Sequence, residues 1–385
     1  MKVRLKELGE IITGNTPSKK IKEFWNSEDI YFIKPDIIED SGVNEISETN
    51  EYISEEARKK ARIVTKKSIF VTCIGSIGKI GIASAGEYAF NQQINAIVPN
   101  EKVQSKYLAY NLLYNKPRLV AMANAPVVPI INKRQFGEFI VNIETDIGRQ
   151  VKIVNVLDRL THIIRLSKQE LEKLDELIKA RFVEMFGDPV TSLKGRKQVP
   201  FSEFMTDIKY GTSQPPQFSE DGEYKFIRAT NIKKGRITEE NMLRISEAEA
   251  AKIQKCKLLG NEIIIVRSGA NTGDTCVVTT EYAENYAGYD IIITLDLTKA
   301  NPVYFNELIN THYMEQIVKP LTARSAQPHL NTKQVQGMPM IVASMDEQNE
   351  FAVFVEQVHK SKVAVQKALD ETQTLFDSLM QEYFG

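Results

Sequence analysis

Residues 153–178 read IVNVLDRLTHIIRLSKQELEKLDELI, and apolar side chains recur in this stretch at alternating intervals of four and three residues. The recurring positions are Ile153, Leu157, Leu160, Ile164, Ser167, Leu171, Leu174 and Ile178. A seam with this seven-residue period is typical of a coiled coil, because positions a and d of each heptad face the partner helix. The stretch therefore predicts a long helix that packs against a second helix.

A second copy of the stretch follows at an offset of 198 residues, at which Gln150 matches Gln348 and Gly187 matches Gly385. Its seam runs through Phe351, Val355, Val358, Lys362, Val365, Leu369, Thr372, Phe376, Leu379 and Tyr383. We expect each helix to span about 35 to 40 residues, which is roughly 55 Å at 1.5 Å per residue.

The polar positions of the two seams differ, since Ser167 matches Val365 and Lys362 matches Ile164. Different defects in the two copies favour pairing of the helices with each other rather than two separate homodimers. The alternative is one long surface helix in each of two domains.

The rest of the chain predicts two globular α+β units, so the fold class is two mixed α/β domains alternating with two long helices. We place the boundaries at 1–146 and 188–345 for the domains, and at 147–187 and 346–385 for the helices. Short β-branched runs predict buried strands, and longer amphipathic runs predict helices. The strand runs are Ile69–Cys73, Ile94–Val98, Ile263–Val266 and Ile291–Leu295, and the helical runs are Tyr107–Leu113 and Tyr304–Ile317.

Composition limits the class of protein. The chain has 49 Lys+Arg and 50 Asp+Glu, which excludes a globally basic nucleic-acid coat but not local basic patches. Cys73, Cys256 and Cys276 lie far apart, so they indicate neither a disulfide scaffold nor a zinc site, and a reducing, cytoplasmic compartment fits best. We expect neither a signal peptide nor a membrane span, because we find no sufficiently long apolar run.

Two motifs look catalytic without meeting the requirements. Asn301-Pro302-Val303-Tyr304 is close to the Asn-Pro-Pro-Tyr signature of adenine methyltransferases, but a helix start with Pro in its first turn explains it better. Residues 75–79, GSIGK, lack the spacing and the Ser/Thr of a phosphate loop. The four histidines match no metal-ligand spacing. No catalytic constellation remains, so we predict a binding protein with no cofactor or metal of its own.

The charge distribution suggests a polyanion partner. Residues 57–67 contain six basic residues and no acid, and residues 225–236 contain five basic residues and no acid. A solvated face is the ordinary explanation for one such run. Two runs at comparable places in two repeats favour a polyanion partner; in a nucleic-acid duplex, for example, phosphate contacts supply affinity without sequence information.

Sequence reading would need hydrogen-bonding side chains on loops, because Arg and Lys pair with guanine edges and Asn and Gln with adenine edges. Any one of these residues could instead be structural; Asn91, for example, could cap a turn. The candidate DNA-binding residues of the first unit are Asn15, Thr16, Lys19, Lys34, Lys59, Lys60, Arg62, Ser76, Lys79, Asn91, Gln92, Lys133 and Arg134. Those of the second unit are Thr212, Ser213, Arg228, Lys233, Arg267, Ser268, Asn271, Arg324, Gln327, His329 and Lys333.

The whole chain resembles the specificity (S) subunit of type I restriction–modification enzymes. The resemblance rests on the order of units and helices and on five short motifs. These are residues 13–18 (TGNTPS), 69–81 with IGK at 77–79, 91–93 (NQQ), 327–331 (QPHLN) before 338–340, and Glu347-Gln348. The chain departs from the family at Tyr289-Asp290-Ile291, where Asn-Gln-Gln is expected, and at Val127-Val128-Pro129, where Gln-Pro is expected.

The resemblance implies that each unit is a target-recognition domain for one half of a split double-stranded DNA site. It also implies that the long helices form an antiparallel spacer and dock two methyltransferase subunits. S-adenosylmethionine would belong to those subunits, and ATP and Mg²⁺ to the restriction (translocase) subunits. Two alternatives from other classes are a methyltransferase with built-in recognition domains and a coiled-coil scaffold without a DNA role.

Overall fold

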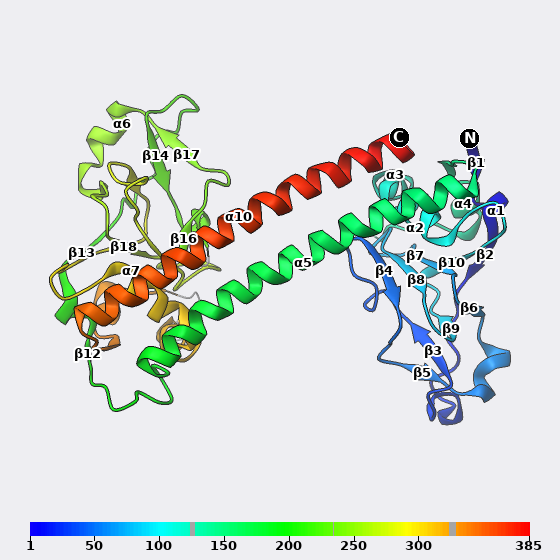
Figure 1. The fold of residues 1–385 in the computed structure, drawn as a ribbon, viewed down its shortest axis with the longest axis horizontal. Helices are drawn as coiled ribbons and strands as arrows, with labels where there is room; N and C mark the ends of the chain where they lie inside the picture. Colours follow the sequence, from blue (N-terminus) through cyan, green and yellow to red (C-terminus); the bar gives the residue numbers. More distant parts are fainter. Residues whose placement is uncertain (124–127, 234, 323–328) are drawn as a thin grey trace. The chain divides into compact units, whose positions relative to one another are not determined.

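The computed structural model describes residues 1–123, 128–233, 235–322 and 329–385. It divides into two compact units, unit 1 with Met1–Lys168 and Lys367–Gly385, and unit 2 with Gln169–Gln366. The long helices are α5 (Ile147–Phe186) and α10 (Met345–Phe384), of 40 residues each. Figure 1 shows both as continuous helices. Each of them begins in one unit and ends in the other.

Unit 1 is built on two β-sheets. The larger has the strand order β2-β10-β7-β8-β4, the smaller has β5-β3-β9-β6, and β1 pairs with β11. The strands are β1 (Lys2–Arg4), β2 (Gly9–Thr13), β3 (Ile30–Ile33), β4 (Val43–Ile46), β5 (Tyr52–Ile53), β6 (Ile63–Thr65), β7 (Ile69–Thr72), β8 (Ile80–Ala83), β9 (Glu87–Phe90), β10 (Ile94–Pro99) and β11 (Ile140–Asn142). The helices are α1 (Leu5–Leu8), α2 (Ser105–Tyr114), α3 (Lys116–Met122) and α4 (Lys133–Glu138), with short 3-10 turns at η1 (Lys22–Trp25) and η2 (Glu55–Lys60).

Alternation along β10 explains how one strand contributes to two of the hydrophobic cores of unit 1. Ile94 and Ala96 are buried with side chains of the smaller sheet, whereas Ile97 is buried with the helices. Successive side chains of a strand point to opposite faces, so one apolar strand serves both cores. The larger sheet is therefore covered on one face by the smaller sheet and on the other by helices.

Unit 2 repeats this arrangement with two sheets, β13-β21-β18-β19 and β17-β14-β20, and the pairs β12-β22 and β15-β16. The strands are β12 (Gln198–Pro200), β13 (Met205–Tyr210), β14 (Tyr224–Ile227), β15 (Ile232–Lys233), β16 (Arg236–Ile237), β17 (Leu243–Ile245), β18 (Ile263–Ile265), β19 (Thr275–Val277), β20 (Tyr286–Ala287), β21 (Ile291–Leu295) and β22 (Pro339–Ile341). The helices are α6 (Glu247–Lys252), α7 (Pro302–Leu308), α8 (Lys319–Thr322) and α9 (Thr332–Gln336), with 3-10 turns η3 (Phe201–Phe204), η4 (Ala229–Asn231) and η5 (Gln254–Cys256).

The strand runs predicted from the sequence all form central strands, but the predicted helix Tyr304–Ile317 is not uniform. It is divided into α7 and a wider π-helical segment, η6 (Ile309–Val318). Thr311 inside η6 has a non-helical ψ of −161°, and its hydroxyl bonds the carbonyl of Leu308. A hydroxyl that bonds back to the preceding turn is a known cause of helix distortion.

The heptad seam predicts the packing of the long helices correctly. In unit 1, Val154 and Leu157 of α5 share a core with Met380 and Phe384 of α10. In unit 2, Ile178, Phe182 and Phe186 share a core with Phe351, Val355 and Val358. In both units the start of one helix meets the end of the other, so the pairing is antiparallel. All eighteen seam residues are buried or half-buried.

Lys362, the polar defect of the second seam, forms an ion pair with Asp175 of α5 in unit 2. The charge is thereby paired at a position that otherwise needs an apolar side chain. A partner on the facing helix reduces the cost of removing an ammonium group from water.

The matched glutamines Gln150 and Gln348 explain part of the sequence repeat. The fully buried side chain of Gln348 accepts from the N–H of Asn301 (2.8 Å) and donates to the carbonyls of Lys299 (3.1 Å) and Ala343 (3.0 Å). Gln150 makes the same three kinds of bond in unit 1, to Gln104, Lys102 and Glu144. Each glutamine thus ties the start of a long helix to the loop that precedes α2 or α7.

Within the described ranges, no helix has the length and hydropathy needed to cross a lipid bilayer.

Candidate nucleic-acid interface

The loops that follow β2 and β9 bring the polar residues of unit 1 together. Thr16 Oγ1 donates to Gln92 Oε1 (3.0 Å). Asn15 fastens the basic run to this loop, because its Nδ2 donates to the carbonyl of Lys60 (2.6 Å) and its Oδ1 accepts from the N–H of Arg62 (2.9 Å). Residues separated by more than 40 positions in the sequence therefore form one polar surface.

The basic run of unit 1, residues 57–67, contains both cations that have partners and cations that are exposed. Arg58 forms ion pairs with Glu55 and Glu87, and the side chain of Arg62 donates to the carbonyl of Thr13. Lys59 and Lys60 are exposed, and neither forms a salt bridge within 4 Å in the described part of the chain. These two ammonium groups are available for phosphate contacts, as are those of the exposed Lys66 and Lys67 of the same run.

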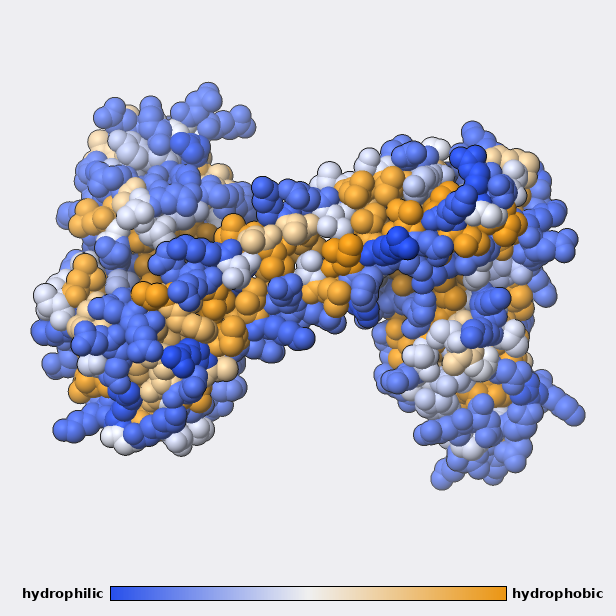
Figure 2. All heavy atoms as spheres, in the orientation of Figure 1, coloured by the Kyte–Doolittle hydropathy of each residue, from blue (hydrophilic) through white to orange (hydrophobic). Residues whose placement is uncertain are grey.

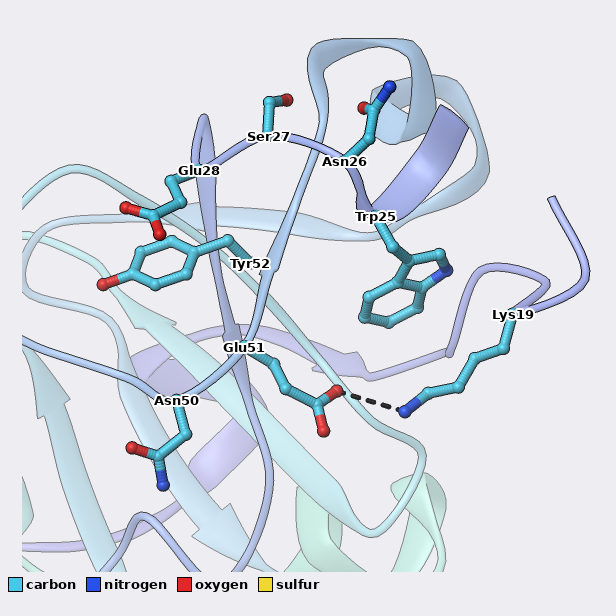
Figure 3. A pocket seen from close by; sticks show the side chains of 8 residues that line it. All are labelled: Lys19, Trp25, Asn26, Ser27, Glu28, Asn50, Glu51 and Tyr52. Carbon is cyan, nitrogen blue, oxygen red and sulfur yellow. Dashed lines mark hydrogen bonds and ion pairs between the residues drawn. The ribbon is translucent and has the colours of Figure 1, made fainter. Parts of the chain in front are cut away.

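Lys19 and Lys34 are held by one carboxylate. Both ammonium groups form ion pairs with Glu51, and Lys19 also lies 5.0 Å from the centre of the Trp25 ring. Lys19, Trp25, Glu51 and Tyr52 are among the residues that line an open hollow of about 490 Å³. Figure 3 shows these side chains. These lysines carry less free positive charge than the sequence suggests, because the one carboxylate of Glu51 offsets part of their combined charge.

The remaining candidates of unit 1 are mixed. Ser76 is exposed between β7 and β8, while the Lys79 ammonium donates to the carbonyl of Pro35 (3.3 Å). Asn91 is 8% exposed and bonds Gln93 twice, so its role in the fold is to shape the turn, the structural alternative considered above. Lys133 and Arg134 are exposed in the first turn of α4.

Nearby acids neutralise two of the cations in residues 225–236, the basic run of unit 2. Lys225 pairs with Glu239 (2.8 Å), whose pKa this bond lowers, and Lys233 pairs with Glu240 (2.6 Å). Arg228 donates to the carbonyl of Asn241 (2.9 Å). The run is therefore a weaker phosphate-binding candidate than residues 59–60 of unit 1.

Thr212, Ser213 and Asn271 lie on turns at one end of the large sheet of unit 2. Thr212 closes a turn onto Gln214 (2.8 Å), with Ser213 exposed beside it. Asn271 donates to the carbonyl of Ala229 (3.4 Å), and Lys333 is exposed on α9. Arg324 and Gln327 lie outside the residues that the structure describes.

The strongest cluster of unit 2 surrounds Arg267. Its guanidinium carbon lies 4.2 Å from the ring centre of Tyr210 and 4.1 Å from that of Tyr289, and its Nη2 lies 2.8 Å from Nε2 of His329. Ser268 forms a backbone bridge to His329. Sequence reasoning identified Arg267 and His329 but missed both tyrosines. Tyr289 stands where the family pattern fails, and this was the available signal; Tyr210 gave none.

Asp290 is a buried acid next to this cluster, and its burial changes its pKa. Asp290 is 3% exposed, and this burial raises the pKa of its carboxyl group to about 6. Its Oδ1 accepts from the backbone N–H of Arg267 (3.1 Å), which lowers the pKa in part. Asp290 therefore fixes the backbone that presents Arg267.

The two motifs that look catalytic have structural roles. Asn301 caps α7 through the N–H of Val303 (3.0 Å), and the Tyr304 hydroxyl donates to the carbonyl of Ile341 (3.0 Å) in the core. Residues 75–79 connect β7 to β8, with no helix after them. Among the described residues, no three His, Cys, Asp or Glu side chains are grouped so that they could hold a metal ion.

The interface loops of both units are held by the same backbone contacts, which together form a common backbone frame. Gly78 N–H bonds the carbonyl of Thr72 (2.9 Å), as Gly273 N–H bonds that of Val266 (2.8 Å). Gly14 and Gly211 each lie so close to the loop before β10 or β21 that a Cβ would meet a carbonyl oxygen at 2.1 or 1.5 Å. The frame is thus duplicated, while the side chains on it differ.

Two α+β units with the same backbone frame and polar loops, each followed in the sequence by a long helix that packs against the other, define a class of duplicated recognition proteins. The profile of the family described as "Type I restriction modification DNA specificity domain" matches residues 1–176 and 205–372. The chain belongs to this family, the specificity subunits of type I restriction–modification systems.

Individual relatives agree with this assignment. The MjaIX specificity subunit of Methanocaldococcus jannaschii is 24% identical over 98% of this chain and 90% of its own length. The HindI specificity subunit of Haemophilus influenzae is 34% identical over 28% of this chain and 23% of its own length. The fold is similar to the crystal structure of an S subunit from M. genitalium, with a TM-score of 0.64, 14% identity and coverage of 100% of this chain and 96% of that chain.

Proposed function

We propose that this chain is a non-catalytic specificity subunit that binds double-stranded DNA at a bipartite site. Each unit reads one half of the site. The observation that carries the proposal is the duplicated frame with different side chains, such as Cys73 in unit 1 and Arg267 in unit 2. One backbone design can read two unrelated half-sites only if the loop side chains differ, because base edges are recognised by hydrogen-bonding groups.

The recognition domains are proposed to be residues 1–146 and 188–345, and the spacer helices 147–187 and 346–385. The spacer is proposed to set the distance between half-sites and to dock two methyltransferase subunits. Apolar side chains exposed along the helices support docking, and Figure 2 shows apolar surface there. They include Ile163, Leu166, Leu177, Val353, Val363 and Leu375.

The chemistry is assigned to the partners of this chain. Methyltransferase subunits would bring S-adenosylmethionine, and restriction (translocase) subunits would bring ATP and Mg²⁺. Assembly of this kind would take place in the cytoplasm, where the DNA is. Polar loops and the exposed Lys59 and Lys60 support a DNA-reading role for this chain.

The test is to produce the full chain with its methyltransferase subunit in cells and to sequence the methylated DNA. We expect one bipartite motif, two specific half-sites separated by unspecified bases. The purified complex should bind that duplex with strong salt dependence. Methylation at a continuous motif, or none with an assembled complex, would refute the proposal.

A further inference from the structure

The cluster around Arg267 sits where three neighbouring strands of one sheet end. Tyr210 is the last residue of β13, Arg267 follows β18, and Tyr289 precedes β21, which lies between the other two strands. The exposed fractions of Tyr210 and Tyr289 are 39% and 43%. The cluster therefore reaches the surface on a rigid sheet edge.

Each member of the cluster is held in place. The Tyr210 hydroxyl accepts from the N–H of Thr332 (3.1 Å), and Asp290 fixes the backbone of Arg267. Because a guanidinium group can only donate, Nε2 of His329 must be the acceptor of its 2.8 Å bond to Arg267. Two stacked rings and one bond restrict the guanidinium group before any ligand arrives.

The bond to His329 uses one of the five N–H donors of a guanidinium group. Nε of Arg267 is buried without a hydrogen-bond partner in the described ranges. Burying a donor without a partner is unfavourable, so folding alone does not account for this arginine.

Unit 1 shows that the frame does not require this arginine. Leu330 N–H bonds the carbonyl of Arg267 (2.8 Å), and Ile131 N–H bonds that of Cys73 (2.8 Å), so Cys73 is the counterpart of Arg267. Cys73 is a buried thiol, and the bridge partner of Ile74 is Ile130 where Ser268 has His329. The same fold forms with apolar residues in place of Arg267 and His329.

We propose that Arg267 reads a guanine in the half-site of unit 2, with Tyr210 and Tyr289 as positioning residues. This inference rests on the proposed function and names one base of the site. A fixed guanidinium fork matches the O6 and N7 acceptors of guanine in the major groove. Rings that stack on the guanidinium group fix the direction of its N–H donors, as a bidentate bond to a base requires. A phosphate contact needs no such restriction.

The experiment uses the complex of the full chain with its methyltransferase subunit and the duplex that methylome sequencing defines. Each guanine of the unit 2 half-site is replaced in turn by 7-deazaguanine, which keeps the base pair but lacks the N7 acceptor. We expect a clear loss of affinity at one guanine with the wild-type complex. If that half-site contains no guanine, or no replacement weakens binding, the inference is wrong.

Variants then assign the loss to the cluster. Arg267→Ala should weaken binding about 5- to 150-fold, which corresponds to the usual 1–3 kcal/mol of a bidentate contact, and should abolish the effect of 7-deazaguanine at that position. Tyr289→Ala should reduce the discrimination between guanine and adenine there, and Tyr289→Phe should restore it. Lys255→Ala removes an exposed cation of the same unit and should leave discrimination unchanged.

The outcomes separate the two levels of the argument. If Arg267→Ala weakens binding to all duplexes equally and leaves base discrimination intact, Arg267 is a phosphate contact and the inference is overturned. A wild-type complex without any preferred duplex would instead overturn the proposed function. Retained preference at the other positions of the unit 2 half-site in each variant shows that unit 2 is folded.

Discussion

Lengthening both long helices at the boundary between the units should lengthen the DNA spacer. Four residues of helix-forming sequence would be inserted after Lys168 in α5 and after Gln366 in α10, where one unit ends and the other begins. Because α5 and α10 are continuous through these points, each insertion adds one helical turn. The core contacts of each unit, such as those of Leu157 and Phe351, are left as they are.

The expected change follows from helix geometry. Four residues add about 6 Å at 1.5 Å per residue, and B-DNA rises about 3.4 Å per base pair, so the spacer should grow by one or two base pairs. Four residues nearly preserve the facing of a heptad seam, since a stutter is absorbed by slight unwinding. A matched control inserts two residues in each helix, which turns the following seam by about 200° and should abolish assembly.

Methylome sequencing of cells that carry each variant measures the result directly. We expect both half-site sequences to be retained in the four-residue variant, with a longer spacer between them. An active four-residue variant with an unchanged spacer would show that the helices do not set the distance between the two recognition units.

Three further predictions concern charge and stability. Replacing Lys59 and Lys60 with Ala should lower the slope of log affinity against log salt by about 0.9 for each lost phosphate contact. The control Lys233→Ala, which removes a cation already paired with Glu240, should change the slope less. If the Lys59/Lys60 variant has the same slope as the wild type, residues 59–60 are only a solvated face. Gln348→Ala should lower the unfolding free energy by about 2–4 kcal/mol, because three buried backbone groups lose their partner. The exposed control Gln357→Ala should change the unfolding free energy by no more than about 0.5 kcal/mol. Equal denaturation midpoints for Gln348→Ala and the wild type would contradict the role of Gln348. The pKa of Asp290, about 6 in the folded chain against an ordinary 3.8, means that the folded chain binds more protons than the unfolded one between these values. Stability should therefore fall by about 3 kcal/mol as pH rises through this window; Asp290→Asn should remove this loss in pH-dependent unfolding, and an identical pH profile in the variant would refute it.

The long helices and central strands could be predicted because their signals are local. A heptad period states which side chains of a helix face its partner, and the β-branched run Ile291–Leu295 forms a buried strand in which every backbone group can pair. The pairing of Lys362 with Asp175 could not be predicted in the same way, since the two residues lie 187 positions apart. Their contact depends on the tertiary register of the helices.

The candidate interface was less predictable, because charge in a sequence does not reveal its partners. Lys34, a candidate DNA-binding residue, pairs with Glu51, and Lys225 of the second basic stretch pairs with Glu239, so other parts of the chain supply both acids. The stacking of Tyr210 on Arg267 needs two strand ends to meet, which no local pattern encodes. The roles of the candidate residues in DNA binding stay predictions for the experiments above.

The exchange of one domain tests the central claim most directly. Residues 1–146 would be replaced by the corresponding domain of another family member, and the methylome of cells carrying the chimera and its methyltransferase subunit would be sequenced. We expect one half of the bipartite motif to change to the donor's sequence while the half read by residues 188–345 and the spacer stay the same. A change in both halves, or in neither, would contradict the account of two independent readers on one chain.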